Sequence, residues 1–106
     1  MQVVTTTIAR RWLADIIAKR KKTEFREIKP YWTKRLKAVD RPFLLRLING
    51  MQPNAPEVII EVTRINKNPR LKRYELRLGR IHNVKNWNRQ SETPISKQRK
   101  VANRRA

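Results

Sequence analysis

The chain has 106 residues, which is the size of one domain, and it contains no cysteine. A domain of this length builds one hydrophobic core, and the absence of cysteine excludes disulfides, thiolate chemistry and cysteine-type zinc sites. Lys and Arg number 27 against 8 Asp and Glu, so the formal net charge is +19 at pH 7. The excess positive charges repel one another, so the composition favours a polyanionic partner. Nucleic acid is the first choice for that partner, and an anionic lipid surface is the second.

The predicted compartment is the cytoplasm. The N-terminal residues reach Arg10 and Arg11 without the apolar stretch of a secretory signal, and no segment approaches the ~20 apolar residues of a membrane span. We therefore expect no membrane partner. We also expect no metal and no cofactor.

A helix is the first predicted element, from Thr7 to about Arg20. The basic run 19–22 closes it, where cations suit the negative end of the helix dipole. The apolar residues that recur on one face of this helix are Ile8, Trp12, Leu13, Ile16 and Ile17.

A strand is predicted over residues 22–26, where side chains of two kinds alternate with a period of two. This alternation places Glu24 and Arg26 on one face of the strand. Pro30 ends the strand, and residues 31–37 are predicted to form one or two helical turns.

Further strands are predicted with close turns between them. Residues 43–48 are a short apolar strand that ends at a turn signal of the Asn-Gly type, and residues 57–65 are a longer buried strand, so the two are predicted to pair as a hairpin. Residues 73–78 show the most regular alternation. Gly79 marks a bulge or a sharp bend before a last predicted strand over residues 81–84.

The predicted core includes the aromatic residues Trp12, Phe25 and Phe43, and Trp87 is predicted to close the structure. Residues 88–106 hold few large apolar side chains and many basic ones. They are predicted to form a flexible basic C-terminal tail that follows the domain of residues 1–87.

The order of these elements predicts an α+β fold. The expected architecture is a small, closed or nearly closed β-barrel of about five strands, with an N-terminal helix and a short second helix. Such barrels bind ligands in an open groove at their edge. The sequence contains no internal repeats.

The end of the first predicted helix and the strand after it resemble a known family. Lys21, Glu24 and Arg26 have the spacing of the G-x-K-x-x-E-x-R signature of the ASCH domain, a relative of the PUA fold. The resemblance covers about residues 8–87. Within the family, this chain is similar to the small ASCH proteins common in phage genomes. Lys19 departs from the pattern, because it stands where the family usually has glycine. The resemblance implies a PUA-like barrel with a positively lined cleft that suits RNA and that the three signature side chains face.

The residues themselves are compatible with the same binding site. Side chains two apart on a strand lie ~6–7 Å apart on one face, so Glu24 and Arg26 are neighbours, and Lys21 can reach them. Arg26 offers a fork for phosphate or a base edge, Glu24 can accept from an exocyclic amine, and Lys21 supplies a positive charge. An ordinary ion pair on a strand is the structural alternative. The predicted nucleic-acid-binding residues are Lys21, Lys22, Glu24, Arg26, Tyr31, Trp32 and Arg35.

Two of these residues are aromatic and follow the signature strand directly. Tyr31 and Trp32 are in a position to stack on unpaired bases. For Trp32 the sequence leaves a second role open, which is to plug one end of the barrel.

A hydrolase acting on RNA or on a modified nucleoside is the alternative function. Some proteins of the resembled family remove acetyl from N4-acetylcytidine with a Lys, a Thr three residues later and a distant Glu. In this chain the residue three after Lys21 is Glu24, and Thr23 is predicted to point to the other face, so that activity is not carried over. If the protein is an enzyme, Lys21 and Glu24 are its candidate catalytic residues. His82 is expected to be a surface or packing residue rather than the acid or base of a ribonuclease.

We therefore expect a binding protein whose partner is RNA, with DNA as the second choice. A third hypothesis is a phage protein that binds a host protein and antagonises a host nucleic-acid machine. The sequence leaves the oligomeric state open.

Overall fold

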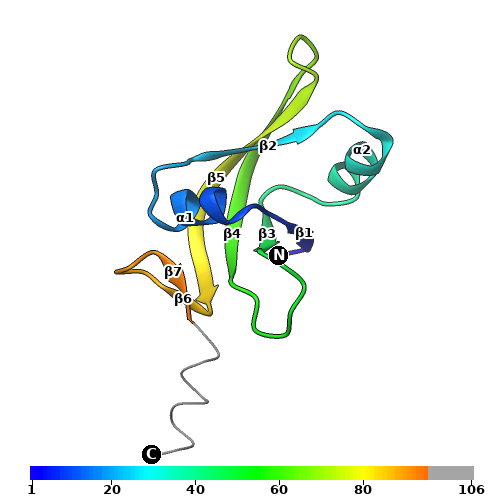
Figure 1. The fold of residues 1–106 in the computed structure, drawn as a ribbon. Coiled ribbons are helices and arrows are strands. Elements are labelled where there is room, and N and C mark those ends of the chain that lie inside the picture. Colours follow the sequence, from blue (N-terminus) through cyan, green and yellow to red (C-terminus); the bar gives the residue numbers. More distant parts are fainter. Residues whose placement is uncertain (96–106) are drawn as a thin grey trace, which may run out of the picture.

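The computed structural model describes residues 1–95, and residues 96–106 lie outside the described part. Figure 1 shows α1 and α2 well separated on either side of the strands, with β4 and β5 as one long hairpin. The elements follow in the order β1 (Val3–Thr7), α1 (Arg10–Ile17), β2 (Thr23–Glu27), α2 (Pro30–Lys37), β3 (Phe43–Ile48), β4 (Glu57–Asn68), β5 (Arg73–Lys85), β6 (Trp87–Asn88) and β7 (Thr93–Pro94).

Five strands form one mixed sheet in the order β1-β3-β4-β5-β2. β1 runs parallel to β3, and the other neighbouring strands are antiparallel. β1 and β2 are therefore the two edges of this sheet. The guanidinium of Arg26 on β2 donates a 3.0 Å hydrogen bond to the main-chain oxygen of Thr7 on β1. The sheet thus curls far enough for one side chain to span the gap between its edges.

The predicted α+β class with two helices and about five main strands is confirmed, but the closed barrel is not found. Within residues 1–95, no backbone ladder joins β1 to β2, and β6 and β7 pair only with each other in a second, two-stranded sheet. A barrel closes when its edge strands exchange main-chain hydrogen bonds. Here a side chain makes that connection, so the sheet stays open.

The sequence analysis missed the N-terminal strand, β1, and the short β6–β7 hairpin. The helix predicted from Thr7 to Arg20 is shorter, because α1 begins only at Arg10. The residues before it form β1, a run of valine and threonine whose branched side chains favour a strand. β1 pairs with β3, which is about 40 residues away in the sequence. A pattern within one segment cannot predict such a pairing.

The remaining elements follow the predictions closely. β3 has both predicted ends, β2 and α2 start and end within one residue of their predicted ranges, and β3 and β4 form the predicted hairpin. The strand predicted separately over residues 81–84 is the continuation of β5. A bulge interrupts the ladder there, because Gly79 and Arg80 together face the single residue Glu61 of β4. A bulge bends the strand and re-aims its side chains.

The turn after α1 has an unusual occupant. Lys19 adopts a left-handed conformation with φ 65°. Its main-chain N–H bonds to the oxygen of Ile16, and the N–H of Arg20 bonds to the oxygen of Asp15. This is the hydrogen-bond pattern of a Schellman motif, whose left-handed residue is usually glycine. Lys19 therefore occupies a glycine-type position.

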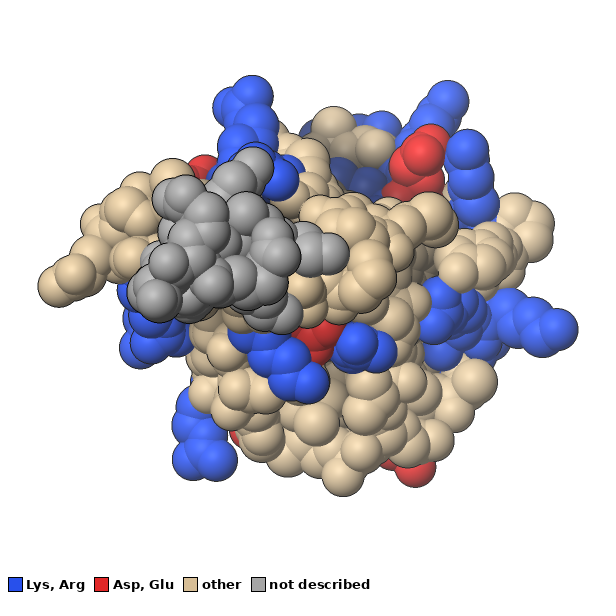
Figure 2. Space-filling view, turned by 60° about the horizontal axis from the view of Figure 1, so that its bottom comes forward, with Lys and Arg blue, Asp and Glu red and all other residues tan. Residues whose placement is uncertain are grey.

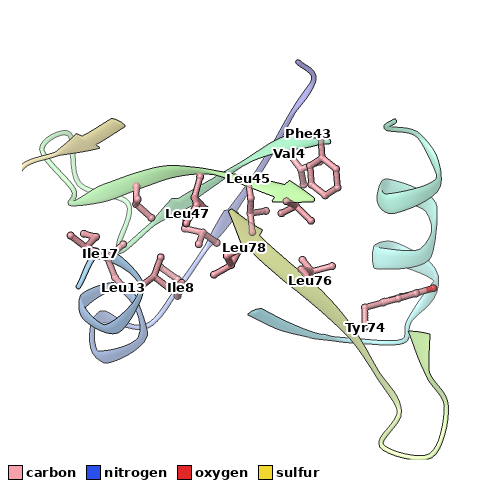
Figure 3. Packing of buried hydrophobic residues seen from close by; sticks show 14 of the residues in the cluster. Val4, Ile8, Leu13, Ile17, Phe43, Leu45, Leu47, Tyr74, Leu76 and Leu78 are labelled. Carbon is pink, nitrogen blue, oxygen red and sulfur yellow. The ribbon is translucent and has the colours of Figure 1, made fainter. Parts of the chain in front are cut away.

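The core lies between the sheet and both helices. Figure 3 shows side chains of β3 and β5 packed together, with Leu13 and Ile17 of α1 at one end and Tyr74 directed toward α2 at the other. Every second residue of β3 is fully buried, including the predicted core residue Phe43. Trp32 and Leu36 of α2 and the predicted Trp87 complete the buried cluster.

Two predicted core residues are not in the core. Trp12 is 40% exposed and Phe25 is 41% exposed. Phe25 is exposed because β2 turns its neighbours Glu24 and Arg26 toward the inside of the sheet. The alternation on this strand was predicted correctly, but the face that carries the phenylalanine is the outer one.

The residues after Trp87 form a small hairpin, in which β6 pairs with β7. Glu92, in the turn of this hairpin, makes a salt bridge with Arg20 after α1. The predicted boundary between a domain and a basic tail at residue 87 stays a prediction, because residues 96–106 of that tail lie outside the described part of the chain.

Candidate nucleic-acid interface

The three signature side chains lie together, as predicted. Glu24 is buried on the inner face of β2, and its carboxylate accepts a 2.6 Å hydrogen bond from Arg26. The ammonium of Lys21 lies 3.5 Å from the other carboxylate oxygen. Two cations therefore share one buried acid. Loss of the carboxylate would leave the two cations close together without a compensating negative charge.

Arg26 is largely engaged by the protein itself. Besides Glu24, it bonds to the main chain of Thr7 and to the hydroxyl of Thr6. Its guanidinium also lies 5.2 Å from the ring centre of Trp32, within cation–π distance. These contacts tie β2 to β1 and α2. They leave Arg26 fewer free donors for a ligand than the sequence suggested.

Lys21 faces a second environment, on the exposed side of the trio. Its ammonium lies 5.2 Å from the ring centre of Trp12 and 4.6 Å from that of Phe25. Arg11 lies 4.4 Å from the Trp12 ring, and Arg73 lies 4.0 Å from the Phe25 ring. The five residues form a continuous alternation of cations and exposed aromatic rings. We name Arg11, Trp12, Lys21, Phe25 and Arg73 the cation–aromatic row.

The cation–aromatic row draws on elements far apart in sequence. Trp12 comes from α1, Phe25 from β2 and Arg73 from β5, with Lys21 in the loop between the first two. Sequence reasoning assigned Trp12 and Phe25 to the core and did not select Arg11 or Arg73. A local signal for Phe25 existed, because it alternates with two charged residues, but the strand pattern alone does not say which face is buried.

The predicted site residues of α2 divide into one exposed and one buried aromatic. Tyr31 is 60% exposed, and Arg35 donates a hydrogen bond to its hydroxyl while lying 5.2 Å from its ring centre. Trp32 is only 8% exposed and belongs to the core cluster. Of the two roles left open for Trp32, the structure therefore favours packing. Tyr31 is accessible, and Arg35 is half-buried beside it.

Residues 23 and 24 do not have the arrangement of the acetylcytidine amidohydrolases. Thr23 lies on the outer face of β2, opposite Arg77, whereas Glu24 lies on the inner face. Thr23 and Glu24 therefore point to opposite faces of the strand, as the sequence predicted. His82 makes a salt-bridge contact with Glu61 across the hairpin, and no contact in the described residues joins it to the signature trio.

Most of the acidic residues are matched to cations, and most of the positive charge is left over. In residues 1–95, every Asp and Glu except Asp40 and Glu61 makes a salt bridge with Lys or Arg, and Glu61 contacts the ring of His82. Glu75 is held most elaborately. Hydrogen bonds from Asn66, Asn68 and Arg73 lower the pKa of its carboxyl below the ordinary value. Figure 2 shows Lys and Arg side chains spread around the face that it draws, with few acidic side chains among them.

Lys22, the remaining predicted site residue, is exposed at the start of β2, where its main-chain oxygen accepts from the N–H of Leu78. Neither helix within residues 1–95 has the length and apolar content needed to cross a membrane. The described residues also contain no group of His, Asp or Glu side chains that could hold a metal ion.

Comparisons with protein-family models, with curated protein sequences and with solved structures find no match. No family or known fold therefore assigns a role to any of these residues.

Proposed function

We propose that the protein binds single-stranded nucleic acid, RNA before DNA, with the cation–aromatic row as the surface that holds the bases. The observation that carries this proposal is the alternation of exposed rings and cations from Arg11 to Arg73. Exposed aromatic rings with neighbouring cations are the groups on which unpaired bases stack, and such a contact is worth ~1–3 kcal/mol per base.

The chemistry of the row favours a nucleic acid over other polyanions. Phosphate groups alone require only cations, which this chain carries over much of its surface. Exposed Trp and Phe rings have an unfavourable contact with water, and a planar base relieves it while its phosphate neutralises an adjacent cation. Bases in a duplex are already stacked and paired, so the row suits unpaired bases.

The PUA-like, ASCH-type assignment is part of the same proposal. Three features support it: the Lys21, Glu24 and Arg26 cluster, the curled sheet whose edges Arg26 connects, and Lys19 in a left-handed turn where the family usually has glycine. On this reading Glu24 and Arg26 hold the scaffold in place. Lys21 connects that scaffold to the binding surface.

Tryptophan fluorescence tests this proposal directly. Trp12 is exposed, whereas Trp32 and Trp87 are buried, so a base that stacks on the row should quench the emission of Trp12 alone. We expect quenching by a mixed-sequence single-stranded RNA, a similar or weaker effect with DNA of the same sequence, and least with duplex RNA. In the Trp12→Phe variant the RNA-induced quenching should largely disappear.

Affinity measurements supply the control. Trp12→Ala and Phe25→Ala should each weaken RNA binding about tenfold, which corresponds to ~1.4 kcal/mol. Leu71→Ala removes an apolar side chain that is even more exposed, at 53%, from the turn between β4 and β5, outside the row, and should leave affinity unchanged. Unchanged affinity in both row variants would show that the row is not the binding surface.

A further inference from the structure

A basic hollow lies beside the cation–aromatic row, between the end of α1 and the bulged part of β5. Its volume is about 470 Å³. Ile16, Ile60 and Leu78 contribute apolar lining, and no acidic residue lines it. The cations that line this basic hollow are Lys19, Lys21, Lys22, Arg77, Arg80 and Arg89.

The positive charge of the basic hollow is almost entirely unneutralised. Lys21 shares Glu24 with Arg26, but the other five lining cations make no salt bridge within residues 1–95. Like charges gathered around a concave surface raise its potential, because field lines converge there. An anion in the hollow therefore interacts favourably with several cations at once.

The sheet also places two arginines where they oppose each other. Arg77 of β5, which lines the hollow, is the direct cross-strand partner of Arg64 on β4. Both side chains are exposed, and like charges directly opposite one another destabilise a sheet. An anion bound near Arg77 would relieve this repulsion.

The backbone contributes two further devices. Lys19 adopts a left-handed conformation that a glycine would adopt without strain. A glycine at this position would have no side chain, whereas Lys19 contributes a cation to the lining of the hollow. At the bulge, Gly79 and Arg80 face one residue of β4, which directs Arg80 out of the regular ladder. Both irregularities bring cations to the same place.

We infer that the basic hollow binds phosphate groups of the nucleic-acid backbone whose bases lie on the cation–aromatic row, an inference that rests on the proposed function. Lys21 belongs to both surfaces, so a strand can place its bases on the row while its phosphates enter the hollow. The row then supplies stacking and the hollow supplies the electrostatic part of the affinity.

Inorganic pyrophosphate tests the anion site without any nucleic acid. In NMR spectra of the ¹⁵N-labelled full chain, pyrophosphate should shift the amide of Gly79 in a saturable way. The Arg77→Gln, Arg80→Gln double variant keeps Gly79 as the reporter. The apparent affinity for pyrophosphate, measured from the shift of its amide, should fall at least about tenfold. A Gly79 response that is absent, or that is equal in the two proteins, would overturn the anion site.

Salt dependence of RNA binding tests the connection between the two surfaces. Each phosphate contact on a single strand contributes ~0.7 to the slope of log K against log salt concentration. The double variant should lose at least one such contact, so its slope should become shallower by ~0.7 or more, while the quenching of Trp12 at saturation persists. The matched control is Lys37→Gln, Arg41→Gln, which removes two exposed cations that lie outside the hollow and make no salt bridge within residues 1–95.

The outcomes separate the two proposals. A slope that falls equally in the double variant and in the control would overturn the hollow as a phosphate site while the row stays supported by Trp12 quenching. Pyrophosphate binding without any RNA binding would overturn the proposed function and leave only a small-anion site. A double variant that unfolds at a lower temperature than the wild type would contradict the repulsion between Arg64 and Arg77.

Discussion

The two faces of β2 use the same kinds of residue for opposite purposes. On the inner face, Glu24 is buried and satisfied by Arg26 and Lys21. On the outer face, Phe25 is exposed between the cations of Lys21 and Arg73. Arg26 is tied to the buried carboxylate and to β1, so it is committed to the fold, whereas Arg73 lies beside the exposed ring and is 35% exposed; Lys21 contacts both groups. Charge alone, therefore, does not identify a binding residue.

The largest effect should come from breaking the inner face. Glu24→Gln leaves Lys21 and Arg26 together without their shared negative charge. Removing one partner from a buried ion pair destabilises a protein by about 3 kcal/mol or more. Urea denaturation should show this loss in the free energy of unfolding. Glu27→Gln on the same strand is the control, because the side chain of Glu27 is 74% exposed and its pairing with Lys29 should matter by less than ~0.5 kcal/mol.

The outer face should respond in binding more than in stability. Phe25→Ala removes an exposed ring and should lower RNA affinity by ~1–3 kcal/mol, with a smaller change in the free energy of unfolding. Phe43→Ala is the opposite case, because Phe43 is fully buried and its loss should destabilise the fold by ~3–5 kcal/mol. Equal destabilisation by both substitutions, measured by urea denaturation, would mean that Phe25 is a core residue after all.

Lys19 offers a substitution in which stability and binding should change in opposite directions. Lys19→Gly relieves the left-handed conformation at φ 65° and should stabilise the protein by up to ~1 kcal/mol. The same change removes one cation from the basic hollow, so the affinity for RNA should fall. Thermal unfolding and RNA titration of the one variant test both effects. A variant that is less stable and binds RNA as tightly as before would refute this account of Lys19.

The smallest expected effect concerns the pH dependence of the outer face. Hydrogen bonds from Asn66, Asn68 and Arg73 lower the pKa of Glu75 in the folded protein. A lowered pKa contributes stability above the unfolded pKa of about 4.3, and that contribution is lost as the pH falls through the folded value. The melting temperature should therefore fall less between pH 6 and pH 3 in Glu75→Gln than in the wild type.

Glu75→Gln also bears on binding. It removes the acid beside Arg73, so RNA affinity near neutral pH should rise slightly if Arg73 belongs to the binding surface. Asp40→Asn supplies the control, since it removes an exposed acid that lies outside the row and makes no salt bridge within residues 1–95. An equal rise in affinity in both variants would mean that only the net charge of the protein matters and that Arg73 has no specific role in binding.

Much of the local structure followed from the sequence, because it depends on neighbours along the chain. The period-two pattern of β2 placed Glu24 and Arg26 on one face, and the apolar run of β3 predicted that strand at both ends. The excess of cations was likewise visible at once. Neither the strand patterns nor the excess of cations tests binding to nucleic acid, which remains a prediction.

Tertiary structure alone decided which of these residues are accessible. The alternation on β2 is the same whichever face is buried, and only packing against β1, α2 and the rest of the sheet turned Glu24 inward and Phe25 outward. The pairing of β1 with β3 and the opposition of Arg64 and Arg77 depend on strand register across distant segments. Burial and register are properties of contacts between segments, so a pattern read along one segment determines its periodicity but not its environment.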